Sequence, residues 1–210
     1  MDFEDEGFQE PSGWLSSSDS DGEHDGTVIA LTPYSRITEH QGDVPIAKKR
    51  LLPGRRPPHD PLRELAIHKL MKQHMLLDPP IMVNVIPLLT YEEFPNGRIT
   101  LDFPLMQTDL RQVYLERKTD IAKDPIQTSL MMQRFSEILS ALQWVHELGI
   151  IHRDVNPSNI LLSEDLKEPA FLADFGIAWV DGHPDDPEQG INKYSAGVGT
   201  GYVLKQSLLM

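Results

Sequence analysis

The residues with the clearest chemical potential lie in two short segments in the second half of the chain. The first, IIHRDVNPSNILL (150–162), places Asp154 and Asn159 between two apolar runs. The second, FLADFGIAW (171–179), holds Asp174 twenty residues beyond Asp154. Either string alone could arise by chance, but both in this order, spacing and local setting indicate one functional site. His152 considered alone is more often a core histidine than a general base.

Together the two segments resemble the catalytic loop, H-R-D-L-x-x-x-N, and the D-F-G motif of the eukaryotic protein kinase family. The resemblance implies phosphoryl transfer from Mg-ATP to a protein hydroxyl, which depends on positioning and on neutralising phosphate charge. It implies that Asp154 accepts or orients the substrate proton, with Asn159 also counted as catalytic. Asn159 and Asp174 would hold Mg²⁺, a hard cation that prefers oxygen ligands. His152 would be a scaffold residue, and Phe175 would set the orientation of Asp174.

The upstream half of the chain adds a strand and a helix to the resemblance. IAKK (46–49) is similar to the V-A-I-K strand of kinases, so that Lys49 would be the catalytic lysine that contacts phosphate. Lys48 is the alternative, because a slip of one residue reverses which side chain faces inward. RELAIHKL (63–70) is similar to the helix whose glutamate, here Glu64, pairs with that lysine. Without the downstream motifs, the basic residues around Lys49 would indicate only a strip of positive charge exposed to solvent.

The segment RITLDFPLMQTDLRQ (98–112) resembles the strand, hinge and first helix that surround adenine in kinases. By this resemblance Phe103 would lie at the back of the adenine pocket. Pro104 and Met106 would offer backbone groups to adenine, and Asp109 would lie near the ribose. Ordinary packing of a strand against a helix explains each side chain equally well. The R-E-L and Q-T-D-L strings are most similar to the cyclin-dependent-kinase branch, although the helix lacks that branch's best-known cyclin-binding string.

Three features depart from the family pattern. No G-x-G-x-x-G precedes Lys49, which removes the backbone amides that a glycine-rich loop brings to the phosphates. Asn156 stands where serine/threonine kinases usually carry a lysine, so a positive charge near the transferred group is lost. GVGTG (197–201) is similar to the end of an activation segment, but residues 202–210 match nothing in the family. We therefore expect a truncated kinase domain that is weakly active or inactive.

The elements that must position these residues follow from apolar periodicity and turn signals. Strands are expected at 27–31, 44–51, 81–89, 98–103, 160–162 and 170–172, with a hairpin turn at Asn96-Gly97. Helices are expected at 61–77, where Asp60-Pro61 marks the start, and at 105–117 and 126–148, with loop-like sequence at the end. The longest helix carries an apolar stripe that has to be buried, formed by Met131, Phe135, Ile138, Leu142 and Val145.

The predicted fold class is α+β: a two-lobed, protein-kinase-like fold with a small β-rich lobe containing one long helix, and an incomplete helical lobe. We expect a disordered acidic tail at 1–26, an N-terminal lobe at 27–106, part of a C-terminal lobe at 107–201 and an unmatched tail at 202–210. The first tail holds nine acidic residues and no Lys or Arg, so it cannot bury enough apolar surface to fold alone.

Composition limits the classes of function. The formal net charge is −13, and removing the nine acids of the first tail leaves about −4, which indicates no general attraction to nucleic acid or membrane lipid. The chain has no cysteine, which excludes disulfides and thiol chemistry. The absence of a signal pattern and of a long apolar run predicts an intracellular protein, in the nucleus or cytoplasm. Expected partners are a protein substrate and an activating or chaperone-like protein.

Three functions stay open on the sequence. The first is an ATP- and Mg²⁺-dependent serine/threonine protein kinase domain. The second is a pseudokinase or nucleotide-binding regulatory module, favoured by the missing glycine loop and by Asn156. The third is an interaction module whose acidic tail and exposed surfaces bind other proteins. Phosphate transfer separates the first from the others, and thermal stabilisation by ATP separates the second from the third.

Overall fold

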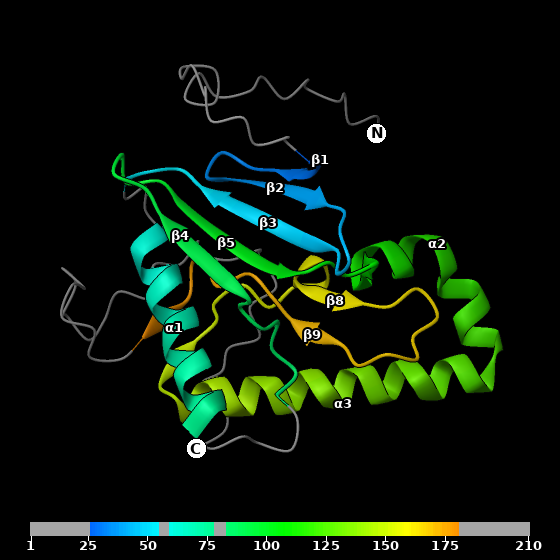
Figure 1. The fold of residues 1–210 in the computed structure, drawn as a ribbon. Helices are drawn as coiled ribbons and strands as arrows, with labels where there is room; N and C mark the ends of the chain where they lie inside the picture. The colour runs from blue at the N-terminus through cyan, green and yellow to red at the C-terminus, as the bar shows by residue number, and fades with distance from the viewer. Residues whose placement is uncertain (1–25, 55–58, 78–82, 181–210) are drawn as a thin grey trace, which may run out of the picture.

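A five-stranded antiparallel sheet and one helix form the N-terminal part of the computed structural model, which describes residues 26–54, 59–77 and 83–180 (Figure 1). The strands lie in the order β1-β2-β3-β5-β4. Their bounds are Thr27–Leu31 (β1), Ser35–His40 (β2), Ile46–Leu51 (β3), Thr90–Glu93 (β4) and Ile99–Pro104 (β5). Helix α1, Pro61–Leu77, packs against the sheet beside β5. The predicted tail at 1–26 lies, except for Gly26, outside the described residues.

The β4–β5 hairpin confirms the turn predicted at Asn96-Gly97. Gly97 has a φ of +80°, a conformation that glycine adopts without steric cost, and the Asn96 side chain accepts a hydrogen bond from the Arg98 amide at 3.0 Å. The strand predicted over 81–89 is wrong. Val85 forms only an isolated parallel bridge to Leu172, and the strand itself begins at Thr90, beyond the proline at 87, which has no amide hydrogen to donate.

Helix α1 begins where the sequence predicts. Asp60 Oδ1 accepts hydrogen bonds from the amides of Leu62 and Arg63 at 3.1 and 3.3 Å, as an N-cap residue does. The buried residues of α1 belong to both apolar clusters of the structure. Leu65 packs with the sheet, whereas Ile67 and Met71 pack with the C-terminal part. The helix therefore holds the two parts of the described chain together.

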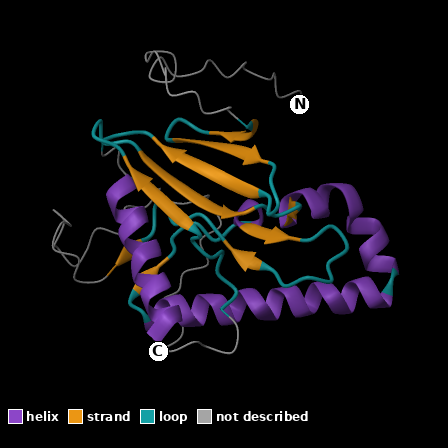
Figure 2. Cartoon of the chain, viewed as in Figure 1, coloured by secondary structure: helices purple, strands orange, loops and turns teal. Residues whose placement is uncertain are grey.

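The C-terminal part consists of two helices and several very short strands (Figure 2). The helices are α2 (Leu110–Lys123) and α3 (Pro125–Glu147), with a 3-10 turn, η2, at Pro157–Asn159. The strands are β6 (Thr108–Asp109), β7 (Ile150–Ile151), β8 (Ile160–Leu162), β9 (Phe171–Leu172) and β10 (Trp179–Val180). The helix predicted over 105–117 is shifted, because residues 108–109 pair with β8 before α2 begins. Strand β10, which pairs with β7, lies in sequence predicted to be loop.

The buried stripe of α3 differs from the predicted one. Ile138 and Val145 are buried as expected, whereas Phe135 is 42% exposed. Arg134 and Ala141 are buried instead, at 3% and 1% exposure. The apolar pattern missed this face because one of its members is an arginine.

Arg134 ties α3 to the loop that leads into β9. Its Nη2 lies 3.1 Å from Glu137 Oε1, and its Nη1 donates to the carbonyl oxygen of Glu168. Glu137 Oε2 in turn accepts a hydrogen bond from the Ala170 amide at 2.8 Å. The ion pair thus fixes the start of β9 against the long helix.

Replacing Arg134 with leucine is expected to lower the free energy of unfolding by about 3 kcal/mol, because it leaves Glu137 and the Glu168 carbonyl without their charged partner. Urea unfolding followed by circular dichroism measures the loss. Ser129→Leu, at an exposed position on the same helix, serves as the control and should change stability by less than about 0.5 kcal/mol. Equal losses in the two variants would contradict a structural role for the Arg134 ion pair.

Residues 84–86 and 170–173 join the two parts of the fold. The Ile86 amide donates to the Leu172 carbonyl at 2.9 Å, and the Leu172 amide donates to the Asn84 carbonyl at 2.8 Å. Asn84 Nδ2 also donates to the Ala170 carbonyl at 3.0 Å. Ala173 is buried in the apolar cluster of the N-terminal sheet. The segment 170–173 therefore completes the core of a lobe that begins more than a hundred residues earlier.

Candidate active site

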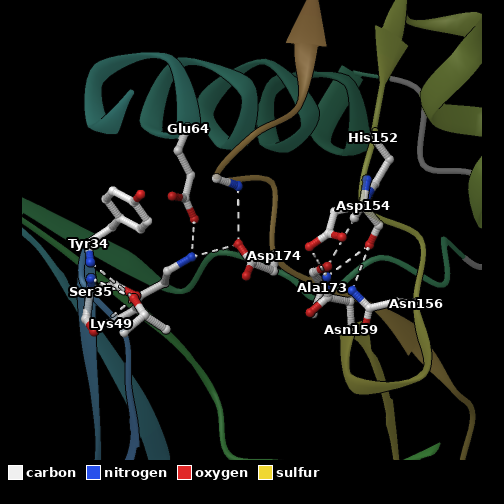
Figure 3. A network of polar contacts seen from close by, with 12 residues as sticks. Tyr34, Ser35, Lys49, Glu64, His152, Asp154, Asn156, Asn159, Ala173 and Asp174 are labelled. Carbon is white, nitrogen blue, oxygen red and sulfur yellow. Dashed lines mark hydrogen bonds and ion pairs between the residues drawn. The ribbon is translucent and has the colours of Figure 1, made fainter. Parts of the chain in front are cut away.

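Lys49 lies at the centre of the candidate site, between α1 and the segment that follows β9 (Figure 3). Its Nζ is 2.6 Å from Glu64 Oε1 and 2.9 Å from Asp174 Oδ1. Lys49 and Glu64 are buried, at 7% and 3% exposure. Because side chains alternate along a strand, Lys48 points to the opposite face of β3. The structure therefore brings Lys49, and not Lys48, to the two carboxylates.

The three charges of this cluster depend on one another. Burial by itself disfavours the Lys49 ammonium, but the charges of Asp174 and Glu64 outweigh it and raise the pKa of Lys49 above its ordinary value. Burial also acts against the Asp174 carboxylate, yet the Lys49 charge and the hydrogen bonds from Lys49 and the Gly176 amide hold its pKa well below the ordinary value. Burial raises the pKa of Glu64, with Lys49 opposing. Lys49 is thus the permanent positive charge of the site.

The loop 152–159 presents Asp154 to the same site. Asn159 Nδ2 donates to both the carbonyl oxygen and Oδ2 of Asp154, at 2.9 and 3.0 Å. Asn156 Nδ2 donates to the Asp154 carbonyl at 3.3 Å, and Asn156 Oδ1 caps η2 by accepting from the Ser158 amide at 2.9 Å. Arg153, with a φ of +66°, donates through Nε to the Ile177 carbonyl at 2.6 Å. Asparagine side chains and a left-handed residue therefore shape this loop.

Asp174 and Gly176 make a tight turn beside Glu64. Asp174 has a φ of +64°, and its Oδ1 accepts from the Gly176 amide at 3.1 Å. A Cβ atom on Gly176 would lie 3.1 Å from Asp174 Oδ1 and 3.2 Å from Glu64 Oε2. Those contacts are tighter than a methyl group normally makes with oxygen, so a larger residue here would have to displace both carboxylates by a few tenths of an ångström.

A row of four aromatic rings runs behind the charged cluster. His152 contacts Phe175 with ring centroids 4.7 Å apart, Phe175 contacts His68 at 5.4 Å, and His68 contacts Phe103 at 5.0 Å. His152 is fully buried and its Nε2 lies 3.0 Å from the Ala173 carbonyl oxygen, which confirms its reading as a core histidine. The row connects the loop 152–159, the segment after β9, α1 and β5.

His68 should make the stability of the protein sensitive to acid. Burial, and to a lesser extent the Lys49 charge, lowers the pKa of His68 from 6.5 to about 3, with Asp174 opposing and His152 adding to the effect. Between these two values the unfolded chain binds a proton that the folded chain does not bind. His68 therefore destabilises the fold as pH falls below 6.5, by up to about 1.4 kcal/mol per pH unit.

Urea unfolding at pH 7, 6 and 5 measures this effect. In His68→Leu we expect the decline in unfolding free energy from pH 6 to pH 5 to be smaller by about 1 kcal/mol than in the unaltered protein. His74→Ala, at an exposed position on the same helix, is the control and should keep the original decline. An unchanged decline in His68→Leu would show that His68 does not titrate with unfolding in this range.

A cavity of about 270 Å³ unites the charged residues. Its wall includes Lys49, Glu64, Asp154 and Asp174, and the turn 32–35 also lines it. Asn159 contacts this group through Asp154. The structure thus brings together the predicted residues of the phosphate and metal end.

The residues predicted to surround adenine do not line this cavity. Phe103 is buried against His68, and Met106 packs partly buried against the apolar cluster of the sheet. Pro104 pairs with Ile46 in the β3–β5 ladder. Asp109 caps α2, because its Oδ1 accepts from the Gln112 amide at 2.9 Å. The contacts of these side chains agree with the alternative given in the sequence analysis, which is ordinary packing of a strand against a helix.

The turn between β1 and β2 lines the same cavity, and the sequence analysis did not predict its contribution. Thr32 Oγ1 accepts from the amides of Tyr34 and Ser35 at 3.2 and 2.9 Å. The Tyr34 ring stacks on His59, with centroids 3.9 Å apart and planes at 19°. Two backbone amides that could face an anion are therefore bonded within the turn. The only available signal was a threonine and a serine flanking Pro-Tyr, which favours a local side-chain turn.

A comparison with protein-family models now identifies the class. The model described as "Protein kinase domain" matches residues 35–200, which is most of the chain. The chain belongs to the protein kinase family. The family and the two-lobed α+β fold expected from the sequence are thereby confirmed.

Several serine/threonine kinases are similar to particular stretches. Serine/threonine-protein kinase csk1 of Schizosaccharomyces pombe is 42% identical over 66 residues, which cover 31% of this chain and 20% of that protein. Cyclin-dependent kinase 1 of Encephalitozoon cuniculi is 30% identical over 127 residues, covering 60% of this chain and 38% of that protein. Cyclin-dependent kinase D-1 of Oryza sativa subsp. indica is 34% identical over 127 residues, covering 59% and 25%. The matches thus span well under half the length of these relatives, and they agree with the resemblance to the cyclin-dependent-kinase branch.

Proposed function

We propose that this chain carries the phosphoryl-transfer site of a serine/threonine protein kinase, with Mg-ATP as donor and a protein hydroxyl as acceptor. The observation that carries the proposal is the position of Lys49, which bridges Glu64 and Asp174 in a cavity that Asp154 also lines. Phosphoryl transfer requires this combination of a fixed cation, metal-binding oxygens and a carboxylate near the acceptor. Mg-ATP would supply the reactive phosphoryl group.

Each residue has a distinct task in this proposal. Lys49, held by Glu64, would bind phosphate oxygens of the donor, and Asp174 would help to hold Mg²⁺. Asn159 Nδ2 donates to Asp154, so the carboxamide oxygen of Asn159 would be the group that helps to hold the metal ion. The carboxylate of Asp154, oriented by that hydrogen bond, accepts or orients the proton of the acceptor hydroxyl. The donor set of carboxylate, carboxamide and phosphate oxygens fits Mg²⁺.

The adenine end of the proposed site lies along the segment 103–109. The Met106 amide makes no hydrogen bond to another described residue, so it is available to a ligand. In this proposal buried Phe103 would lie at the back of the adenine, and Pro104 and Asp109 would lie beside it. Asp109 already caps α2, so a contact with the ribose would have to be made while it keeps that cap.

The test is transfer of ³²P from [γ-³²P]ATP to myelin basic protein by the purified chain, with and without Mg²⁺. We expect labelling that requires the metal and that disappears in Lys49→Met. Absence of labelling together with absence of thermal stabilisation by Mg-ATP would reject the proposal.

A pseudokinase or nucleotide-binding regulatory module is the second candidate. The Thr32 turn, whose amides are already bonded, favours it because a phosphate group would find few backbone donors there. Asn156 favours it as well, because an uncharged side chain occupies the site of the usual lysine and serves to cap η2. On this alternative, Mg-ATP stabilises the chain without phosphate transfer.

Asn156→Lys distinguishes the two candidates. A lysine here would restore a positive charge beside the transferred group, and we expect kcat to rise by up to about 10²-fold, the effect of one well-placed electrostatic group. Loss of the η2 cap should lower stability by about 1 kcal/mol. Ser158→Ala, which alters the same turn without adding charge, is the control. A phosphorylation rate that stays at the background level in Asn156→Lys would favour the regulatory module.

Partners and location follow from the proposed activity. The substrate would be a protein, and an activating or chaperone-like protein would complete the site, as the names of the cyclin-dependent relatives suggest for those proteins. Within the described residues no helix is long and apolar enough to cross a membrane. We propose the nucleus or cytoplasm as the location, without a nucleic-acid or membrane partner.

A further inference from the structure

His59 is a half-buried residue in the wall of the Lys49 cavity, just before the start of α1. Its ring stacks on Tyr34, with centroids 3.9 Å apart and planes at 19°, so one face of the imidazole is covered. A Cβ atom on Gly176 would lie 3.2 Å from His59 Nδ1 and 3.1 Å from Asp174 Oδ1, so both atoms border the same point of the turn. Tyr34 therefore holds an imidazole that has one nitrogen beside the charged residues.

The described wall of this cavity is rich in acids. Its carboxylates belong to Asp60, Glu64, Asp154 and Asp174. Among the described residues of the wall, only Lys49 and His59 have side-chain nitrogens that can donate to an anion. The ammonium of Lys49 is already shared between two carboxylates. The phosphates of ATP carry several negative charges, so they need a further donor in this wall.

Backbone amides that border the cavity already have partners within the chain. In the turn 32–35, two amides donate to Thr32 Oγ1, and at the start of α1 two amides donate to Asp60 Oδ1. Helix starts and tight loops commonly bind phosphate through amides at these positions. Here a side-chain donor has to take their place, and His59 lies between this turn and the start of α1.

The charge state of His59 suits this task. Burial lowers the pKa of His59 below its ordinary value of 6.5, with the Asp174 and Asp154 charges opposing and the Lys49 and Arg63 charges adding to the effect. The imidazole is therefore neutral at neutral pH and carries one N–H donor. A neutral ring is not drawn into an ion pair with the neighbouring carboxylates, yet it can donate to a phosphate oxygen.

We propose that His59 is a phosphate-binding residue of this site, which donates an imidazole N–H to a phosphate oxygen of ATP beside Lys49. This inference deepens the proposed function and rests on it. The stacked ring of Tyr34 keeps the imidazole in place. The hydrogen bond supplies a donor in a chain that has no glycine-rich loop and that carries Asn156 in place of the usual lysine.

Isothermal titration calorimetry of the full chain with Mg-ATP and with adenosine, which has no phosphate, tests the inference. His59→Phe keeps a ring to stack on Tyr34 but removes both nitrogens. We expect the Kd of this variant for Mg-ATP to be about tenfold higher than that of the unaltered chain, the effect of one hydrogen bond to a charged group. The Kd for adenosine should stay the same. His74→Phe, the same change at an exposed position of α1, is the control and should keep both Kd values.

NMR spectra of the unaltered chain with ¹⁵N-labelled histidine give a second measurement, which does not depend on whether a variant folds. Mg-ATP should shift the side-chain nitrogen signals of His59 in one saturable process, whereas adenosine should leave them unchanged. Saturable binding of Mg-ATP without that shift would overturn this inference alone. An equal change, or no change, in the two Kd values of His59→Phe would do the same. Absence of saturable Mg-ATP binding to the unaltered chain would reject the proposed function together with this inference.

Discussion

Asp174→Ala is expected to abolish the stabilisation of this protein by Mg-ATP. In the unaltered chain, nucleotide at about 100 times its Kd should raise Tm by roughly 5–10 °C for a domain of this size. Asp174 is the carboxylate that Lys49 holds in the cavity, at 2.9 Å, and it is the proposed ligand of the metal ion. Without it, the metal would keep only Asn159, and the phosphate charges would stay poorly neutralised.

Differential scanning fluorimetry with ATP, with and without Mg²⁺, measures this shift. Asp120→Ala serves as a control, because Asp120 is an exposed acid on α2, and it should keep the full shift. A magnesium-dependent shift that persists in Asp174→Ala would place the nucleotide elsewhere on the protein.

Asp154→Asn should reduce the rate of phosphate transfer by about 10²–10⁴-fold, the usual contribution of a general acid or base. Asparagine retains the size of the side chain and an oxygen that can accept from Asn159 Nδ2, so the loop should keep its shape. The KM for ATP should change little, because the bridge from Lys49 to Glu64 and Asp174 does not involve Asp154.

Initial rates of ³²P transfer over a range of ATP concentrations separate these two effects. Asp165→Asn, at a surface acid that pairs with Lys167, is a matched control and should retain the rate. An unchanged kcat in Asp154→Asn would remove Asp154 from the proposed chemistry.

The sequence predicted best what depends on short-range signals. The cap at Asp60 and the turn at Asn96-Gly97 are local, and both occur as expected. The strand predicted over 81–89 failed, because apolar content alone does not show that this segment is buried beside Leu172 rather than paired within the sheet. Strands of two residues, such as β7 and β10, are too short to show a period.

In the candidate site too, sequence motifs were predictive, whereas contacts that depend on the tertiary fold were not. Family motifs predicted which residues would gather around Lys49, and strand alternation explains why Lys49 rather than Lys48 does so. No motif indicated the stacking of Tyr34 on His59, because this contact depends on how a turn folds over a helix start. The cap formed by Asp109 was not predicted either, since an aspartate before a helix suits capping and ligand binding equally.

Residues 170–173 also determine when, during synthesis of the chain, the core of the N-terminal lobe can be completed. Lys49 and Asp174 are 125 positions apart, and the N-terminal sheet includes Ala173 in its core. A nascent chain that ends at residue 106 would contain every strand of that sheet, yet it would lack the segment that bonds to residues 84–86. Part of the core of the N-terminal lobe is therefore synthesised well after the last strand of its sheet, and Lys49 can pair with its second carboxylate only after Asp174 has been synthesised.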